Sequence, residues 1–191
     1  MKRIALFFTI LTLVAPLVAK ADNPLRIKAG SLAALKLGRG AISFDIDLSQ
    51  TKYKGTPLYD YLEQANVDRE YFDDNVPEME RYFAEKWNKK IGKGCKIAGS
   101  DDDAKYYMVV VVKTLQLGSV ASAALSGMGG ASVSGKVLFF DDGEGDEPFC
   151  EVEVLKQQGT LSGSSVAGIE GLKWVFNDLA ENLCDLVKHS K

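Results

Sequence analysis

The sequence predicts an α+β domain with a mixed or mainly antiparallel sheet of about four strands and two or three helices packed on one face. Three observations support this fold class. Apolar and polar residues alternate over 42–49, as in a strand with one buried face. Residues 106–112 form an unbroken apolar run rich in β-branched residues, which is typical of a central strand buried on both faces. Apolar residues recur at spacings of three and four over 166–186, which predicts a long amphipathic helix.

Weaker patterns place the elements before the central strand. Residues 22–40 are expected to form an extended or irregular lead-in, because glycines interrupt them. Thr56 and Pro57 are expected to open a short helix, with the threonine as N-cap. A second helix is expected to begin near Asn75 and to stop at Gly92. Three leucines of the lead-in should anchor it: Leu32, Leu35 and Leu37.

A hairpin and the long helix complete the chain. Strands over 132–140 and 149–157 are joined by an acidic, glycine-containing turn, which predicts an antiparallel hairpin. Ser164 and Ser165 are expected to cap the final helix. No internal repeat or domain boundary is visible after residue 21, so residues 22–191 are expected to form a single α+β domain.

The first 21 residues read as a signal peptide. Lys2 and Arg3 precede a largely apolar run over 4–18, and Ala19 and Ala21 suit a signal peptidase, so cleavage is expected after Ala21. A retained membrane anchor is the alternative, although the run is shorter than the roughly 20 residues that span a bilayer. We therefore expect a periplasmic or secreted protein, without a transmembrane segment in the mature chain.

Charge, cysteines and histidine exclude several classes of function. The chain has a net charge of −3, and its first 21 residues hold three cations and no acid, so the mature chain is more acidic still; this argues against nucleic acid as a partner. Cys95, Cys150 and Cys184 lack the spacing of redox or zinc motifs; one disulfide or none, with buried thiols, is expected, and the pairing stays open. His189 is the single histidine, which leaves no imidazole for a catalytic triad. No cofactor, metal site or catalytic set is predicted.

A segment without charge, rich in Gly, Ser and Ala, covers residues 114–135. It lacks the spacing of a phosphate-binding loop, so we interpret it as a hairpin loop that could bind a partner. The candidate partner-binding residues are Gly118, Ser119, Ser126, Gly127, Met128, Gly129 and Gly130.

Acidic residues offer two further candidates. The clusters at 101–103 and 141–147 do not match a calcium-binding loop and are interpreted as solvated turns. Asp45 and Asp47 should project from the same face of one strand, which would suit acid–base chemistry on a glycosidic bond. Alternation alone also explains this pair, because a solvated strand face needs polar residues.

The order of the predicted elements resembles the amino-terminal domain of TolB and related outer-membrane-assembly lipoproteins. The segments KAGSL (28–32), LK (35–36) and FDIDLS (44–49) are also similar to a group of uncharacterised exported bacterial proteins. No lipid-anchor cysteine follows the apolar run, which departs from the lipoproteins. The resemblance implies a non-enzymatic role in the cell envelope and transfers no active-site residue.

These observations lead to one expected function and two alternatives. We expect a non-enzymatic binding or assembly module of the bacterial cell envelope, whose partner is an envelope protein or glycan. Contacts would come from the loop at 118–135 and from exposed sheet edges that can accept a strand. The alternatives are a carboxylate-based envelope hydrolase acting on glycan or peptide, and a structural secreted domain without a specific partner.

Overall fold

The computed structural model describes residues 23–99, 104–117, 130–141, 147–159 and 169–191. Within these residues the order of elements is β1 (Leu25–Gly30), the 3₁₀ helix η1 (Ala33–Leu37), β2 (Ala41–Asp47), β3 (Lys52–Tyr53), β4 (Thr56–Pro57), α1 (Leu58–Gln64), α2 (Arg69–Asp73), α3 (Val76–Lys90), β5 (Ala104–Gln116), β6 (Ser132–Asp141), β7 (Cys150–Gln158) and α5 (Ile169–His189).

The sheet is mixed, which confirms the α+β class. Its strand order is β1-β7-β6-β5-β3-β4, and β2 also pairs with β5. Both β2 and β3 run parallel to β5, on successive parts of the same edge, while the β5–β6–β7–β1 pairs are antiparallel. The described sheet has seven strands, so the expectation of about four is wrong. Two of the additional strands, β3 and β4, are only two residues long and leave no periodic pattern to read.

The lead-in contains the third additional strand. Residues 25–30 form β1, which pairs with β7, so this part of the chain is not irregular. Leu32 and Leu35 are fully buried, as expected, whereas Leu37 is 67% exposed. Leu37 ends η1, and the chain turns away at Gly38 with a φ of 63°, a conformation that glycine adopts without strain.

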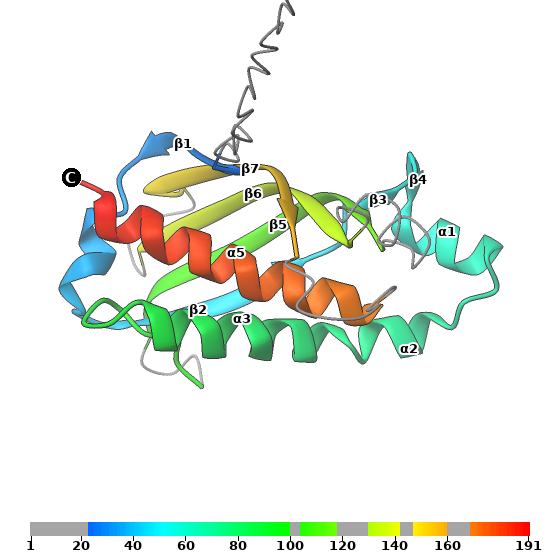
Figure 1. The fold of residues 1–191 in the computed structure, drawn as a ribbon, viewed down its shortest axis with the longest axis horizontal. Helices are drawn as coiled ribbons and strands as arrows, with labels where there is room; N and C mark the ends of the chain where they lie inside the picture. The colour runs from blue at the N-terminus through cyan, green and yellow to red at the C-terminus, as the bar shows by residue number, and fades with distance from the viewer. Residues whose placement is uncertain (1–22, 100–103, 118–129, 142–146, 160–168) are drawn as a thin grey trace, which may run out of the picture.

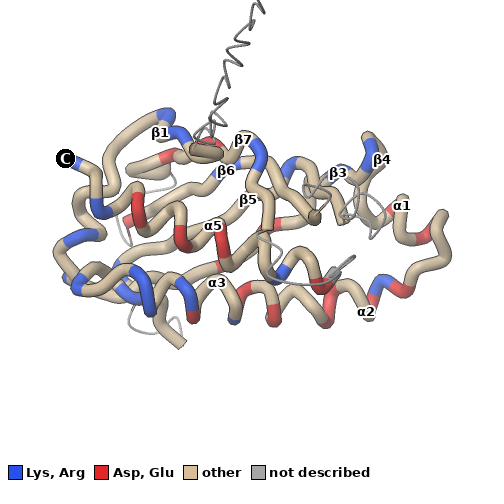
Figure 2. The backbone as a smooth tube through the Cα atoms, viewed as in Figure 1, with Lys and Arg blue, Asp and Glu red and all other residues tan. Residues whose placement is uncertain are grey.

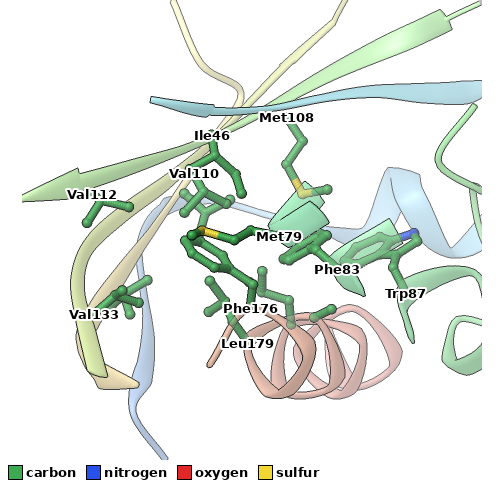
Figure 3. Close-up of a cluster of buried hydrophobic side chains, with 14 of the residues drawn as sticks. Ile46, Met79, Phe83, Trp87, Met108, Val110, Val112, Val133, Phe176 and Leu179 are labelled. Carbon is green, nitrogen blue, oxygen red and sulfur yellow. The ribbon is translucent and has the colours of Figure 1, made fainter. Parts of the chain in front are cut away.

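Helices α3 and α5 lie side by side on one face of the sheet, as Figure 1 shows. The core lies between this helical layer and the sheet (Figure 3). Each large apolar side chain moved into it stabilises the fold by roughly 1.5–3 kcal/mol. The side chains that meet there are Met79, Phe83 and Trp87 from α3, Phe176 and Leu179 from α5, and Ile46, Met108, Val110, Val112 and Val133 from the sheet.

The sequence predicts that both faces of β5 are buried, but the structure buries only one of them. Along this strand Met108 and Val110 are buried, whereas Val109 and Val111 are half-buried and Tyr107 is 39% exposed. The alternation arises because helices cover only one side of the sheet in the described part of the chain. The apolar run therefore continues onto a face that no described helix covers.

Helix starts differ from the sequence prediction in two places. Thr56 and Pro57 pair with β3, so α1 begins at Leu58 without a threonine cap. The short helix α2 was not expected; Asp68 caps it by accepting a hydrogen bond from the Glu70 amide. Helix α3 begins one residue after Asn75, as expected. The predicted caps Ser164 and Ser165 lie outside the described residues.

None of the helices in the described residues combines the length and apolar character needed to cross a membrane.

Candidate functional site

The sheet face opposite α3 and α5, here called the open face, carries an apolar strip. Residue alternation places these side chains opposite their buried neighbours, and register aligns them in pairs: Tyr107 lies opposite Phe140, and Val109 lies opposite Leu138. The Tyr107 and Phe140 ring centroids are 6.4 Å apart. The strip consists of Tyr107, Val109, Val111, Leu138 and Phe140, and the exposed Leu155 of β7 lies on the same face, beyond Glu153.

Charged residues border this strip on both sides. Asp45 of β2 lies opposite Val109 and is exposed, and Glu151 of β7 lies opposite Leu138. On the β7 side the charges are paired: Lys136 lies 3.8 Å from Glu151, and Lys28 lies 3.0 Å from Glu153. The open face therefore offers an apolar, partly aromatic centre with a polar border, the composition of many protein–protein contact surfaces.

The described sheet edges carry features that disfavour strand addition. In β1 the register shifts between Ile27 and Ala29, and Lys28 sits at this irregularity. The free edge of β2 is covered by Glu80 of α3, whose carboxylate accepts a hydrogen bond from the Ile46 amide at 3.3 Å. Strand β4 ends in Pro57, which lacks an amide hydrogen. Bulges, cations, proline and covering helices are the usual protections of edge strands, so these edges give strand addition little support.

The predicted partner-binding loop lies almost entirely outside the described residues. Gly118, Ser119, Ser126, Gly127, Met128 and Gly129 belong to 118–129, and only Gly130, half-buried just before β6, is described. The binding role of this loop stays a prediction.

The structure separates the two aspartates that alternation paired. The Asp47 carboxylate accepts a hydrogen bond from the Ser49 amide at 2.8 Å, so it holds the turn after β2. Asp45 instead lies beside Glu80 of α3. Burial raises the pKa of Glu80, and the neighbouring Asp45 raises this pKa further, while the Ile46 amide opposes the shift.

Sequence reasoning missed Glu80, the third member of this acidic group. It lies on α3 between the buried positions Met79 and Phe83, where a helical pattern predicts an ordinary solvated position. Its role depends on α3 lying along the β2 edge, which is a tertiary contact. The sequence does place Glu80 at the border of the apolar face of this helix. A border position does not indicate which residue the side chain contacts.

The cysteines are unsuited to nucleophilic chemistry. Cys95, Cys150 and Cys184 are free and buried. Burial raises the pKa of Cys150 to about 11 and that of Cys184 to about 12, so both are protonated thiols at neutral pH. The His189 ring lies in the last turn of α5, with Nδ1 2.6 Å from the Asp185 carbonyl oxygen. Within the described residues no group of three or more His, Cys, Asp or Glu side chains could hold a metal ion.

A second surface feature, here called the acidic hollow, lies between α1 and α2. Its volume is about 600 Å³. The Arg69 guanidinium lies over the Tyr59 ring at 4.0 Å and is paired with Asp73 at 3.3 Å, while the Tyr59 hydroxyl donates a hydrogen bond to Asp73 at 3.0 Å. These contacts fix the hollow's only cation among the described residues and neutralise it. The hollow is lined by Tyr59, Asp60, Glu63, Asn66, Val67, Asp68 and Arg69.

No family model and no curated protein matches this chain. Among solved structures, it is similar to two PelC dodecamers from Paraburkholderia phytofirmans, at 14% and 15% sequence identity. Each match covers 83% of this chain and 95% or 96% of the PelC chain, with a TM-score of 0.41. The resemblance to TolB and related lipoproteins stays a prediction.

Proposed function

We propose that this protein is an exported, non-enzymatic binding or assembly module of the bacterial cell envelope, and that it holds its partner on the open face. One observation carries this proposal: a strip of apolar and aromatic side chains lies on the sheet face that no described helix covers. Tyr107 and Leu155 are 39% and 47% exposed, and they are two of the five large hydrophobic side chains exposed among the described residues. Contiguous exposed apolar surface commonly marks a binding site.

The open face suits an envelope protein or a glycan. Removing apolar surface from water contributes about 25 cal/mol per Å², so a partner covering the strip gains free energy from its centre. The charged border then favours partners with matching polar groups. Tyr107 also offers a partly exposed aromatic ring, a surface that can pack against a sugar.

Export is the part of the proposal that depends on residues 1–21. Their basic start, apolar run and small residues before Asp22 support a cleaved signal peptide. Cell fractionation together with amino-terminal sequencing of the mature protein tests it. A mature protein beginning at Asp22 in the periplasm or medium supports export, whereas an uncleaved cytoplasmic protein contradicts it.

The binding role is tested by affinity recovery of residues 22–191 from a crosslinked envelope extract. The test variant combines Tyr107→Thr and Leu155→Thr, because threonine keeps strand propensity while removing the apolar surface. Tyr71→Ser, which removes an exposed side chain from α2, is the matched control. Circular dichroism verifies that all three proteins are folded.

We expect the wild type and Tyr71→Ser to recover the same partner and the double variant to lose it. Equal recovery by the folded double variant would overturn the placement on the open face. If the wild type recovers no reproducible partner, the structural secreted domain becomes the better interpretation.

A carboxylate hydrolase is the competing proposal, and the raised pKa of Glu80, which burial and the neighbouring Asp45 cause, favours it, because a general acid needs a raised pKa. The same wild-type preparation can be incubated with envelope glycans and peptides. Turnover that disappears in both Asp45→Asn and Glu80→Gln would support hydrolysis over binding.

A further inference from the structure

Charge is segregated between the two ends of the long axis (Figure 2). Residues 58–74, which include α1 and α2, contain six acids and Arg69 as their only cation. Lys54, a nearby cation, lies over the Tyr53 ring at 5.2 Å and does not line the acidic hollow. The acids of this end are Asp60, Glu63, Asp68, Glu70, Asp73 and Asp74.

The opposite end is basic. It is formed by η1 with the turn that follows it and by the end of α3 with its following turn (Figures 1 and 2). The segments 31–40 and 86–99 contain no acidic residue, and the acidic residues 101–103 lie outside the described part of the chain. Glu181 pairs with Lys86 and Lys90. The exposed Arg39, Lys89 and Lys93 have no ion-pair partner among the described residues, and neither has Lys36.

Residues 36–40, here called the basic knob, project an apolar side chain at this end. Leu37 is 67% exposed and is flanked in sequence by Lys36 and, beyond Gly38, by Arg39. The turn that follows α3 supports the knob. Gly38 packs so closely on this turn that a Cβ atom on Gly38 would lie 2.2 Å from the Lys93 carbonyl oxygen. The Lys36 ammonium also donates a hydrogen bond to the Ser190 carbonyl oxygen at 2.7 Å. Leu37 is thus exposed on a turn that contacts with Lys93 and Ser190 hold in place.

The acidic hollow has the complementary character. Val67 lines it and is 39% exposed, and the carboxylates of Asp60, Glu63 and Asp68 surround it. Arg69 is already paired with Asp73, so the unpaired charge of the hollow is negative. The hollow therefore combines an exposed apolar residue with acids, and the basic knob combines an exposed apolar residue with cations.

We propose that the protein associates head to tail with further copies of itself, with the basic knob of one copy seated in the acidic hollow of the next. Leu37 would lie against Val67, and Lys36 and Arg39 would face Asp60, Glu63 and Asp68. A second copy is the occupant that the observations favour, because one chain carries both complementary surfaces. Leu37 and Val67 are also two of the five large exposed hydrophobic side chains of the described residues, one at each end.

The position of the two surfaces determines the kind of assembly. They lie at opposite ends of the molecule, so the contact joins different patches and leaves one of each exposed (Figure 1). Such a heterologous contact generates a ring when the rotation between copies closes and a filament when it does not. The contact does not involve the open face, so this proposal and the proposed binding function can fail independently.

Sedimentation velocity on purified residues 22–191 tests the proposal. Charged surface contacts weaken once the ionic strength rises well above physiological, so the protein is measured at about 0.05 M and about 0.5 M NaCl. We expect the wild type to form species larger than a monomer at low salt and to dissociate at high salt. Arg39→Glu and Glu63→Arg should each weaken association at least about tenfold at low salt.

Mixing the two variants gives the sharpest outcome. In an equimolar mixture, the knob of Arg39→Glu fits the hollow of Glu63→Arg, and the knob of Glu63→Arg fits the unchanged hollow of Arg39→Glu. Association should therefore return on mixing, which neither misfolding nor loss of net charge can produce. Lys156→Glu, an exposed change of the same sign on β7, is the matched control and should associate like the wild type.

Three outcomes would overturn the proposal. A wild type that stays monomeric at low salt would leave no self-association to explain, and an anionic partner would then be the better occupant of the basic knob. Association that both variants retain would place the contact elsewhere. Variants that lose association singly and do not regain it on mixing would contradict the pairing of knob and hollow.

Discussion

Glu80 joins the helical layer to the edge of the sheet through a single side chain. Its carboxylate accepts a hydrogen bond from the Ile46 amide and lies beside Asp45. Burial, followed by the nearby Asp45, raises the pKa of Glu80. A raised pKa means that the folded protein binds this proton more tightly than the unfolded chain does, so Glu80 favours folding when it is protonated.

This predicts a specific dependence of stability on pH for Glu80→Gln. As pH rises from the usual Glu value of 4.5 through the higher pKa of the folded state, the wild type loses stability that the glutamine variant keeps. Glutamine can still accept from the Ile46 amide and can donate to Asp45. Urea unfolding at about pH 4.5 and about pH 7 should therefore show that the variant gains stability relative to the wild type as the pH rises.

The exposed Glu63→Gln serves as the control and should follow the wild type at both pH values. If the Glu80→Gln variant also follows the wild type, folding does not raise the pKa of Glu80 and the prediction is wrong. Glu80→Ala removes the acceptor of the Ile46 amide as well, and it should cost about 1 kcal/mol at either pH.

At the residue scale, local patterns identified side chains but not their partners. Alternation correctly placed Asp45 and Asp47 on the polar face of one strand. It could not reveal that Asp47 binds the Ser49 amide while Asp45 turns to Glu80 of α3. Leu37 was expected to anchor the lead-in because it is apolar, yet the end of η1 and the left-handed turn at Gly38 leave it exposed.

At the scale of elements, α3 and α5 are clamped by Glu181. The Glu181 carboxylate lies 2.6 Å from the ammonium groups of both Lys86 and Lys90, one on each oxygen. The hydrogen bond from Lys86, followed by that from Lys90, lowers the pKa of Glu181 to about 2. The side chains of this clamp are 27–35% exposed, so solvent screens their attraction.

Glu181→Gln should therefore destabilise the fold by no more than about 1 kcal/mol at neutral pH and low salt. A lowered pKa contributes stability that is fully present above the usual Glu value of 4.5 and is lost as the pH falls toward 2. The difference from the wild type should thus shrink both at low pH and at high salt. Thermal unfolding over a pH and salt series measures it.

Glu85→Gln provides a matched control for the clamp. Glu85 pairs with Arg81 within α3 and is 63% exposed, so its loss breaks an ion pair that does not connect two helices. It should cost less than Glu181→Gln. If Glu181→Gln is equally destabilising near pH 3 and pH 7, its effect comes from packing rather than from the clamp.

The elements with long periodic patterns could be predicted from the sequence, and the short ones could not. The spacing of apolar residues located α3, α5 and the strands β2, β5, β6 and β7 within a few residues. Strand β1 was missed because its alternation covers only Leu25 to Ala29 and ends at Gly30, which is too short a run to stand out. Strands β3 and β4 are stabilised by pairing with neighbours rather than by their own sequence. The burial of β5 on one face only depends on where helices pack, which alternation within an apolar run does not show.

At the scale of the whole molecule, β1 and the residue after it contact both the edge of the sheet and the end of the chain. Strand β1 covers the edge of β7, and its Leu25 is buried in the core. Directly after β1, the Ser31 hydroxyl donates a hydrogen bond to the Lys191 carbonyl oxygen at 2.9 Å. The segment that follows β1 and the residues that follow α5 therefore lie side by side, as Figure 1 shows.

Deletion of residues 23–31 should make the protein aggregate. Without β1, the nine-residue strand β7 becomes an edge that has no proline and no covering helix in the described part of the chain. Long uncovered edges pair with other chains, so light scattering should rise with protein concentration for the deletion variant.

Leu25→Ala, which keeps the β1 backbone, should lose about 2–3 kcal/mol of stability without aggregating. Such a contrast would assign the protection to the strand's backbone pairing. A deletion variant that stays monomeric at every concentration would instead show that β7 needs no partner strand.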